Sequence, residues 1–388
     1  MNSISDLRST TKASYPGLAG FCLASLLPLL ATATAANTPA VLQCLEADRK
    51  KPDTTIVITD LEPDDRFALH VLAHNLDAEE LDLAGTTLLH TSLKTVLLRR
   101  LLAQLDLGGV KVVQGFGRRP DEYPPTRSSA AARSFAVEGV GILSSSELSE
   151  IPNDRNDSAA LRPAIVDVLS EHSRVDIVLL APGDDLAAAL EERPALADRV
   201  ACLFMMGGWQ DRPGKGLRST YNWNMAPESA DHLLSRDNLP IVLFSSHALR
   251  KSFASISVNR DNFPELWQVI EDNAGESPSI SETLVASAAW DKHIVSAYPA
   301  VREVLEPHVG RNFSPADPTV AIALADGDII DGFELMNVEL DLDDLDMESG
   351  YAVTIEENDG GHVAVVESIN VDVFRRVMIE SLSRSTAH

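Results

Sequence analysis

The stretch that decides the fold is Thr54-Thr55-Ile56-Val57-Ile58-Thr59-Asp60-Leu61-Glu62-Pro63-Asp64-Asp65. Its first six residues form a short, continuous and mostly β-branched run, which is typical of a strand buried on both faces of a parallel sheet. The strand ends at Asp60, and residues 64–75 follow with apolar side chains at helical spacing. The stretch therefore predicts a strand, an acidic loop and a helix, in that order.

Strand-like and helical segments alternate along the rest of the chain. Further strands are expected at residues 81–87, 110–113, 175–180, 201–206 and 239–244, and further helices at residues 93–105, 186–192 and 371–382. Residues 335–368 are strand-like with two turns, which predicts a late antiparallel hairpin. The pattern indicates an α/β protein with an open, mostly parallel sheet flanked by helices, whose ligand crevice lies at the carboxyl ends of the strands.

The composition excludes some classes of partner. The chain has 388 residues, of which 45% are hydrophobic and 23% charged, as in an ordinary globular protein with one large domain or two smaller ones. Asp and Glu number 58 against 32 Lys and Arg, so the formal net charge is −26. This charge disfavours nucleic-acid polymers and anionic membranes and suits a divalent cation, although it also serves solubility alone.

The first 35 residues have the pattern of a secretory signal peptide. Arg8 and Lys12 precede an apolar stretch at residues 17–30, and Ala33-Thr34-Ala35 supplies the small residues of a cleavage site. The apolar stretch is shorter than the roughly 20 residues that a spanning helix needs. We therefore expect a secreted or periplasmic protein, with no membrane contact once the signal is removed.

The cysteines give no sign of a shared site. Cys22, Cys44 and Cys202 make no C-x-x-C spacing, and Cys22 falls in the predicted signal peptide. The sequence therefore predicts neither a disulfide framework nor a zinc site. Because Cys202 lies in the apolar run 200–206, we expect it to pack as a free, buried thiol.

The acidic loop has the composition of a cation site, with Asp60 closing the strand and Asp64 and Asp65 opening the helix. Calcium takes six to eight oxygen ligands at roughly 2.3–2.6 Å, and converging carboxylates could supply many of them. Alternatively, Asp64 or Asp65 simply caps the helix, because Asp is favoured at helix N-termini. Three neighbouring carboxylates repel one another unless a cation or protons hold them, so a cation is the simpler interpretation.

The acidic loop also resembles a family motif. The run Asp60-Leu61-Glu62-Pro63-Asp64-Asp65, followed by Ala68-Leu69, is similar to the D-P-G-x-D-D fingerprint of the inosine/uridine-preferring nucleoside hydrolase superfamily. Leu61 and Glu62 replace the Pro and Gly of the fingerprint, while all three aspartates are kept.

Later segments resemble motifs of the same family, in the same order. Residues 180–187 are similar to its G-P-L-T-N-[IL]-A turn, residues 205–208 to its M-G-G strand end, residues 221–228 to its E-F-N-x-x-x-D-P-E stretch, and residues 317–321 to its H-D-P-x-A-V segment. The resemblance implies one nucleoside hydrolase-like domain at residues 54–383, with the open, largely parallel sheet of that family.

The resemblance implies an activity and a set of site residues. The activity is calcium-dependent hydrolysis of the N-glycosidic bond of a ribonucleoside or related N-riboside, which passes through an oxocarbenium-like state. Asp60 is implied as the general base. The implied metal ligands are the carboxylates of Asp60, Asp64, Asp65 and Asp317 and the backbone carbonyl of Asp184. Asp65 and Asn222 are implied to bind the ribose hydroxyls.

Several positions depart from the family pattern. The family His before the distant Asp is Ala316 here, the acidic residue of the E-F-N stretch is Thr220, and the His of an H-G-x-x-G-L segment corresponds to Phe135. Attack by water is therefore better supported than protonation of the leaving base. Residues that could substitute for the missing groups are His90, Glu138, Trp209, Trp223 and Asn224. Of these, Trp209 could stack on a base.

Three functions remain open from the sequence. The first is an exported N-riboside hydrolase, which the retention of Asp60 favours because a simple binder needs no general base. The second is a non-catalytic calcium- and sugar-binding homologue, which Ala316 favours. The third is a hydrolase of a different glycoside or of a modified nucleotide, in which the altered pocket reflects a different leaving group. Because members of the family often assemble as dimers or tetramers, the resemblance also implies a homodimer or homotetramer.

Overall fold

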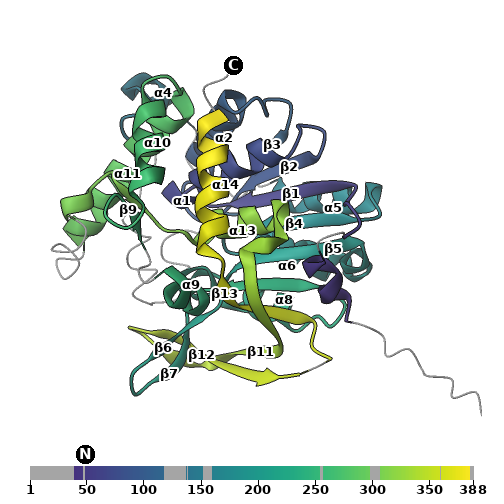
Figure 1. The fold of residues 1–388 in the computed structure, drawn as a ribbon. Helices are drawn as coiled ribbons and strands as arrows, with labels where there is room; N and C mark the ends of the chain where they lie inside the picture. Colours follow the sequence, from purple (N-terminus) through teal and green to yellow (C-terminus); the bar gives the residue numbers. More distant parts are fainter. Residues whose placement is uncertain are drawn as a thin grey trace, which may run out of the picture. The chain divides into compact units, whose positions relative to one another are not determined.

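A computed structural model of the protein describes residues 39–46, 49–117, 137, 139–151, 160–253, 257–297, 306–358 and 360–384. The predicted signal peptide, residues 1–35, lies outside these ranges. Strand β1 (Thr54–Thr59) lies in the central sheet and leads through a short loop into helix α1 (Pro63–Asn75) (Figure 1). Both elements occupy the predicted positions, because the β-branched run ends at Thr59 and Pro63 favours the start of a helix.

Eleven strands of the described residues form one sheet, in the order β3-β2-β1-β4-β5-β8-β13-β11-β12-β7-β6. Their bounds are β2 (Leu81–Thr86), β3 (Lys111–Gln114), β4 (Val175–Leu179), β5 (Val200–Gly207), β6 (Trp209–Arg212), β7 (Gly216–Ser219), β8 (Ile241–Ser245), β11 (Ile330–Asp346), β12 (Gly350–Glu357) and β13 (Val363–Ile369). A separate antiparallel pair consists of β9 (Val258–Asn259) and β10 (Asn312–Phe313).

The sheet changes character at β13. From β3 to β13 neighbouring strands pair in parallel, whereas β11, β12, β7 and β6 pair in antiparallel fashion. The predicted mostly parallel sheet is confirmed, and so is the late hairpin, which is formed by β11 and β12. The second hairpin, β6 with β7, was not predicted from the sequence.

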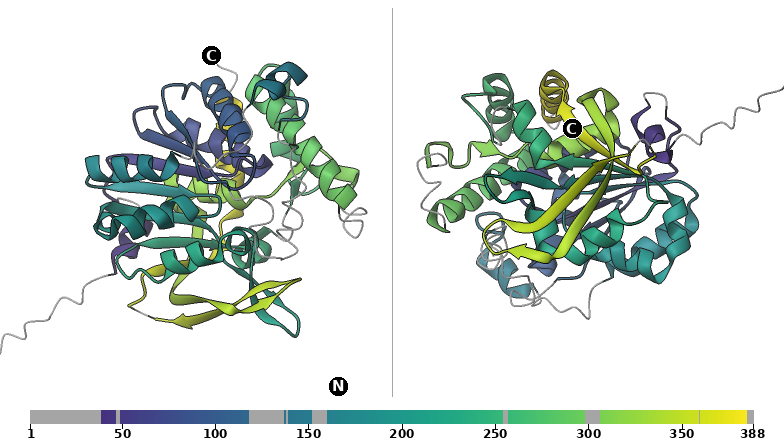
Figure 2. Two further views of the ribbon diagram at one scale, coloured as in Figure 1. Left: turned by 180° about the vertical axis from the view of Figure 1, so that it is seen from behind. Right: turned by 90° about the horizontal axis from the view of Figure 1, so that it is seen from below.

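Helices cover both faces of the parallel part. Their bounds are α2 (Thr91–Gln104), α4 (Ser145–Glu150), α5 (Leu161–Glu171), α6 (Asp184–Glu192), α7 (Tyr221–Met225), α8 (Pro227–Leu234), α9 (Ser246–Phe253), α10 (Pro264–Ala274), α11 (Pro278–Ala297), α13 (Ala316–Ala325) and α14 (Val371–Arg384). Figures 1 and 2 show α1, α13 and α14 on one face and the teal helices α5, α6 and α8 on the other. Among the described residues, no helix has both the length and the apolar character that crossing a membrane requires.

Each face of the sheet has its own hydrophobic core. Val57 belongs to the cluster under α1, α13 and α14, whereas Ile56 and Ile58 belong to the cluster under α5, α6 and α8. Successive side chains of a strand point to opposite faces, so all of β1 is buried. This confirms the interpretation of its β-branched run, and it places Asp60 at the carboxyl end of a central strand.

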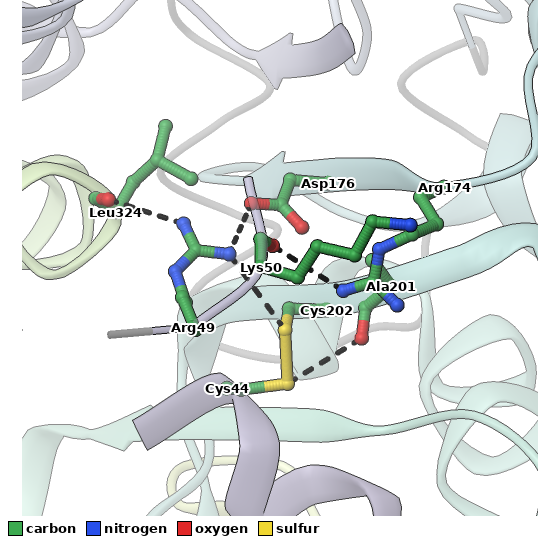
Figure 3. The surroundings of a disulfide bond; sticks show 8 residues. All are labelled: Cys44, Arg49, Lys50, Arg174, Asp176, Ala201, Cys202 and Leu324. Carbon is green, nitrogen blue, oxygen red and sulfur yellow. Dashed lines mark hydrogen bonds and ion pairs between the residues drawn. A yellow bond between two sulfur atoms is a disulfide. The ribbon is translucent and has the colours of Figure 1, made fainter. Parts of the chain in front are cut away.

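One expectation from the sequence is wrong: Cys202 is not a free thiol. It forms a disulfide with Cys44, which lies on the short 3-10 helix η1 (Ala40–Leu45). Figure 3 shows Arg49 beside this disulfide, where its guanidinium donates to the buried Asp176 at 2.6 Å and to the carbonyl of Leu324 at 3.2 Å. The cysteines are 158 positions apart, so only the folded chain reveals the pair. Together these contacts join the N-terminal segment to β4, β5 and α13.

Candidate active site

A cavity of about 470 Å³ opens at the carboxyl ends of the parallel strands. Its floor follows the strand order: Asp60 comes after β1, Leu180 after β4, Met206 and Gly207 end β5, and Ser246 follows β8. This is the edge at which open α/β sheets bind ligands, because loops and helix starts converge there. The sequence predicted a crevice at this edge.

Carboxylates from two separate segments meet at one end of the cavity. Asp64 and Asp65 are at the start of α1, and Asp317 is at the start of α13, which packs against α1. One carboxylate oxygen from each of the three lies within 4.8 Å of the others. Asp60 lines the same part of the cavity and interacts electrostatically with all three. The structure thus brings together the four predicted side-chain ligands.

The cluster is electrostatically strained when its members are all ionised. Burial, followed by repulsion from Asp60, raises the pKa of Asp64 to about 7. Burial, with repulsion from its acidic neighbours, raises the pKa of Asp65 and the pKa of Asp317 well above the ordinary carboxyl range. Protons or a cation must relieve this repulsion near neutral pH. Hard, all-oxygen donors match calcium or magnesium, so these residues fit a divalent cation.

The acidic loop is held by a reciprocal helix cap. Glu62 is the N-cap of α1, and its backbone N–H donates to Asp65 Oδ2 at 3.0 Å, while the Thr59 hydroxyl donates to Asp65 Oδ1. The capping interpretation therefore holds for Asp65, in addition to its place in the cluster. Leu61 has φ 53°, an unusual value for a residue with a Cβ, at a position where the family fingerprint has Pro.

Glu62 adds a carboxylate that the sequence analysis treated only as a loop change. Its side chain lines the cavity beside Asp60 and Asp64. Burial, followed by repulsion from Asp60 and Asp64, raises the pKa of Glu62 well above its ordinary value, and Lys94 opposes that rise. The sequence signal for Glu62 was its replacement of the family Gly, because this position of the loop lies beside the clustered aspartates Asp60 and Asp64.

Asn222 lies on the cavity wall at the ends of β4 and β5. Its side-chain amide donates to the carbonyl of Leu180 at 2.8 Å and to that of Met206 at 3.2 Å. Both amide hydrogens are therefore used to fix the side chain over the ends of β4 and β5. Toward a sugar, this arrangement leaves Asn222 the role of a hydrogen-bond acceptor through Oδ1.

Comparison with known proteins agrees with this geometry. A sequence profile for the inosine-uridine preferring nucleoside hydrolase family matches residues 55–376. The chain belongs to this family. The nucleoside hydrolase fold is accordingly the one described above, and the members of the family are N-glycosyl hydrolases. Comparison with curated protein sequences finds no match.

Solved structures of nucleoside hydrolases share the fold. The plant enzyme PpNRh1 aligns with a TM-score of 0.60 at 17% identity, over 86% of this chain and 99% of its own. A purine-preferring ribonucleoside hydrolase from Gardnerella vaginalis aligns with a TM-score of 0.61 at 18% identity, over 86% of this chain and 99% of its own. The type III effector protein XopQ, complexed with adenosine diphosphate ribose, aligns with a TM-score of 0.56 at 18% identity, over 89% of this chain and 98% of its own. At such low identities the alignments establish the fold alone.

Some predicted site residues of this family member lie away from the cavity wall. Asp65 is fully buried behind the wall, so its predicted contact with ribose has no support from its position. Trp209 is buried in the core under α5, α6 and α8, where its ring centroid lies 6.3 Å from that of Trp223. It does not line the cavity, as a stacking residue would. His90 precedes α2 with φ 54° and is not part of the cavity lining.

The remaining predicted residues have mixed placements. Asn224 lines the cavity, but it is largely buried, and its amide donates to the carbonyl of Ser219 at 3.1 Å. Asp184 begins α6, where its side chain accepts from Ser229 at 3.1 Å, and its predicted carbonyl contact with a metal stays a prediction. Glu138 lies outside the described residues. Ala316 lines the cavity, so no histidine reaches the substrate from that position.

The sequence analysis missed two further walls of the cavity. Helix α11 contributes Trp290, Asp291 and Ile294, and Arg212 with Arg250 lies on β6 and α9. Burial raises the pKa of Asp291 to about 6, although hydrogen bonds from Gly310 and Asn312 oppose the rise. None of these five residues belongs to a family motif identified in the sequence, and the sequence of α11 is that of an ordinary apolar helix.

Proposed function

We propose that this chain hydrolyses the N-glycosidic bond of a ribonucleoside or a related N-riboside in a calcium-dependent reaction. The observation that carries the proposal is the convergence of Asp60, Asp64 and Asp317 on the cavity that Asn222 also lines. Calcium is preferred to magnesium because four carboxylates of one protein site suit a large, flexible coordination shell, whereas magnesium usually keeps several waters. Nucleoside hydrolases act on small nucleosides, and a cavity of about 470 Å³ accommodates one.

The protein's own residues divide the work. Asp60, at the cavity surface, would accept the proton of the attacking water as general base. Asn222 would accept a hydrogen bond from a ribose hydroxyl, and its fixed amide would hold the sugar in register with Asp60. A bound divalent cation supplies orientation of the ribose diol and a lower pKa for water. The four carboxylates Asp60, Asp64, Asp65 and Asp317 would hold it, with the carbonyl of Asp184 as a further predicted ligand.

The test is hydrolysis of inosine, uridine and p-nitrophenyl riboside, with and without EDTA. We expect cleavage of at least the activated riboside, loss of activity in EDTA and recovery with added calcium. Asp60→Asn should lower the rate of that cleavage by about a hundredfold or more, in line with loss of a general base. An Asp60→Asn protein with wild-type activity would overturn the assignment of the base.

A non-catalytic role is favoured by one specific observation, the Ala316 side chain on the cavity wall. A homologue that had lost protonation of the leaving group would still bind calcium and sugar. The p-nitrophenyl riboside separates the two functions, because its leaving group needs no acid. If this substrate is not cleaved while calcium still raises the melting temperature, the binding role is the correct one.

We also propose export from the cytoplasm. The signal-like residues 1–35 and the Cys44–Cys202 disulfide agree, since disulfides persist mainly in oxidising compartments. Detection of the chain in the periplasm or medium, with its N-terminus cut near Ala35, would support this proposal. Sedimentation of the purified protein would test the dimer or tetramer that the family resemblance implies.

A further inference from the structure

The cavity wall carries a buried carboxyl group outside the acidic loop and the aspartate cluster, that of Asp291 on α11. Burying a carboxyl is unfavourable, so its place on a ligand cavity needs an explanation. When a base leaves an N-riboside, it takes the electron pair of the broken bond and must gain a proton. None of the four predicted metal-binding carboxylates can give a proton while it holds a cation, so hydrolysis requires a separate acid.

The hydrogen bonds of Asp291 decide which of its oxygens can carry a proton. Oδ2 accepts from the backbone N–H of Gly310 at 2.7 Å and from Asn312 Nδ2 at 2.9 Å. The orientation of the Asn312 amide is fixed, because Nδ2 also donates to the carbonyl of His308 at 2.9 Å. Two N–H groups directed at Oδ2 exclude a proton from it. The neutral carboxyl therefore carries its proton on Oδ1, the oxygen that takes part in neither bond.

The surroundings of Asp291 favour its protonated form. Burial raises the pKa of this carboxyl to about 6, and the hydrogen bonds from Gly310 and Asn312 oppose the rise. Charged or titratable side chains on α11 and on the elements packed against it include Lys292 and His293 on α11, His308 in η5 (Glu306–His308), Arg66 on α1, Arg100 on α2 and Glu271 on α10. The causes of the pKa shift are burial and hydrogen bonding, without a contribution from these charges. A carboxyl of this kind gains and releases a proton near neutral pH, as a general acid must.

A short segment of chain joins Asp291 to the aspartate cluster. Asn312, which bonds Asp291, is in β10, and the side chain of Ser314 hydrogen-bonds Asp64. Phe313 between them packs in the core, and both Asn312 and Ser314 line the cavity. Two residues of extended chain span at most about 7 Å. The Asp291 and Asp64 carboxyls are therefore bonded to neighbouring side chains of one cavity wall, and a single ribonucleoside can contact both.

Other proton-bearing groups of the cavity wall are less suited to this role. The side chain of Glu348 is 87% exposed and lies 3.9 Å from Lys215, as an ordinary surface carboxylate does. The hydroxyl of Tyr221 is buried, and the guanidinium groups of the wall keep their protons. Glu62 belongs to the acidic loop, where the cation and the attacking water would be held. Asp291 is the carboxyl that is both on the cavity and separate from that loop.

We propose that Asp291 is the general acid that protonates the departing base through Oδ1. This inference deepens the proposed N-riboside hydrolysis and rests on it. Water adds its hydroxyl to the anomeric carbon and gives its other proton to Asp60. The C–N bond breaks with its electron pair going to the glycosidic nitrogen, and a ring nitrogen of the base takes the proton from Asp291. The products are ribose and the neutral base, and exchange with solvent then returns Asp60 to its ionised form and Asp291 to its protonated form.

The kinetic test compares Asp291→Asn with the wild type on two substrates. The carbonyl oxygen of Asn can accept the same two hydrogen bonds as Oδ2, so the change removes the acidic proton and keeps the local structure. We expect kcat for inosine to fall about a hundredfold and kcat for p-nitrophenyl riboside, whose leaving group needs no acid, to stay within about twofold. The matched control is Glu306→Gln, which removes an exposed carboxyl in η5 outside the cavity lining and should change neither rate.

A pH profile supplies a result that a purely structural role of Asp291 would not produce. In the wild type, the kcat/KM for inosine divided by that for p-nitrophenyl riboside should fall about tenfold per pH unit above about pH 6, because both substrates need Asp60 and only inosine needs the acid. In Asp291→Asn this ratio should not depend on pH.

Several outcomes would overturn the assignment of Asp291. These are an equal loss of both activities in Asp291→Asn, a loss confined to inosine in Glu62→Gln and absent from Asp291→Asn, or a wild type that cleaves p-nitrophenyl riboside and leaves inosine intact. Failure of the proposed function gives a different result, because a wild type that cleaves neither substrate refutes the hydrolysis itself and the role of Asp291 with it.

Discussion

The side-chain amide nitrogen of Asn222 lies 2.8 Å from the carbonyl oxygen of Leu180. With a second bond to Met206, this contact places an asparagine from α7 over the ends of two buried strands. Asn222→Asp should therefore be more damaging than an exposed Asn→Asp change, because an acceptor would replace a donor that faces two carbonyls. We expect a loss of about 1–3 kcal/mol in the free energy of unfolding.

Urea unfolding of Asn222→Asp and of Asn238→Asp measures this difference. Asn238 is a suitable control because its side chain is exposed and donates to Asp198 at 2.8 Å, next to the amino-terminal ends of β8 and β5 and away from the carboxyl ends that line the cavity. We also expect Asn222→Asp to lower kcat/KM for any riboside substrate. Equal stability of the two variants would show that the amide donors contribute nothing to placing α7.

The buried position of Asp317 predicts opposite effects with and without metal. In EDTA, Asp317→Asn should raise the melting temperature, because it removes a charge that repels Asp64 and Asp65. With calcium at a hundred times its dissociation constant, the wild type should gain about 2.7 kcal/mol, and the variant should gain much less. Thermal unfolding with and without calcium tests both signs, with the exposed Asp328→Asn as control. A variant that calcium still stabilises fully would remove Asp317 from the metal site.

The parallel part of the fold could be predicted because its signal is local. In β1, the β-branched run of residues 54–59 itself records burial on both faces, and Pro63 fixes where α1 begins. Hairpin β6–β7 has no comparable signal in the sequence, because its strands are short, mostly polar and only partly buried. The pairing of Cys44 with Cys202 depends on where η1 folds against β5, which no spacing of the two residues encodes.

The residues of the candidate site also differ in whether the sequence could predict them. Asp60, Asp64 and Asp65 are adjacent in the chain, and Asp317 was found only through its resemblance to a family motif. Arg250 and Asp291 are single charged residues on helices, and nothing in the local sequence distinguishes them from solvent-exposed charges. Trp209 follows a strand end, as a base-stacking residue could. In the structure, however, α7 packs tightly against the end of β5, where the Trp223 indole lies against Gly207, and Trp209 is buried beside Trp223.

Asp291 predicts a specific pH dependence of stability. Its carboxylate accepts from the Gly310 backbone at 2.7 Å and from Asn312 at 2.9 Å, and burial raises its pKa to about 6 from 3.8. A raised carboxyl pKa favours the protonated form in the folded state. Its stabilising contribution is therefore complete below pH 4 and is lost as the pH rises through 6. Two pKa units correspond to at most about 3 kcal/mol.

Urea unfolding of the wild type and of Asp291→Asn between pH 4 and pH 8, in EDTA, isolates this group. The variant carries no titrating carboxyl at this position. Between pH 4 and pH 7 the wild type should therefore lose unfolding free energy relative to Asp291→Asn. Other carboxyls, including Asp64, titrate in both proteins and cancel in the difference. A difference that does not change with pH would mean that Asp291 has an ordinary pKa.

The Cys44–Cys202 disulfide should stabilise the chain against unfolding. It closes a loop of 158 residues, and removing a native disulfide typically destabilises a domain by about 2–4 kcal/mol. Loss of the bond should also loosen the segment that carries Arg49, leaving the fully buried Asp176 without its ion-pair partner. We expect dithiothreitol to lower the urea midpoint of the wild type and to leave that of a Cys44→Ser, Cys202→Ser protein unchanged. Arg49→Gln should lower the urea midpoint both in the oxidised wild type and in the Cys44→Ser, Cys202→Ser protein. An effect seen only when the disulfide is absent or reduced would show that the ion pair with Asp176 contributes only in that state.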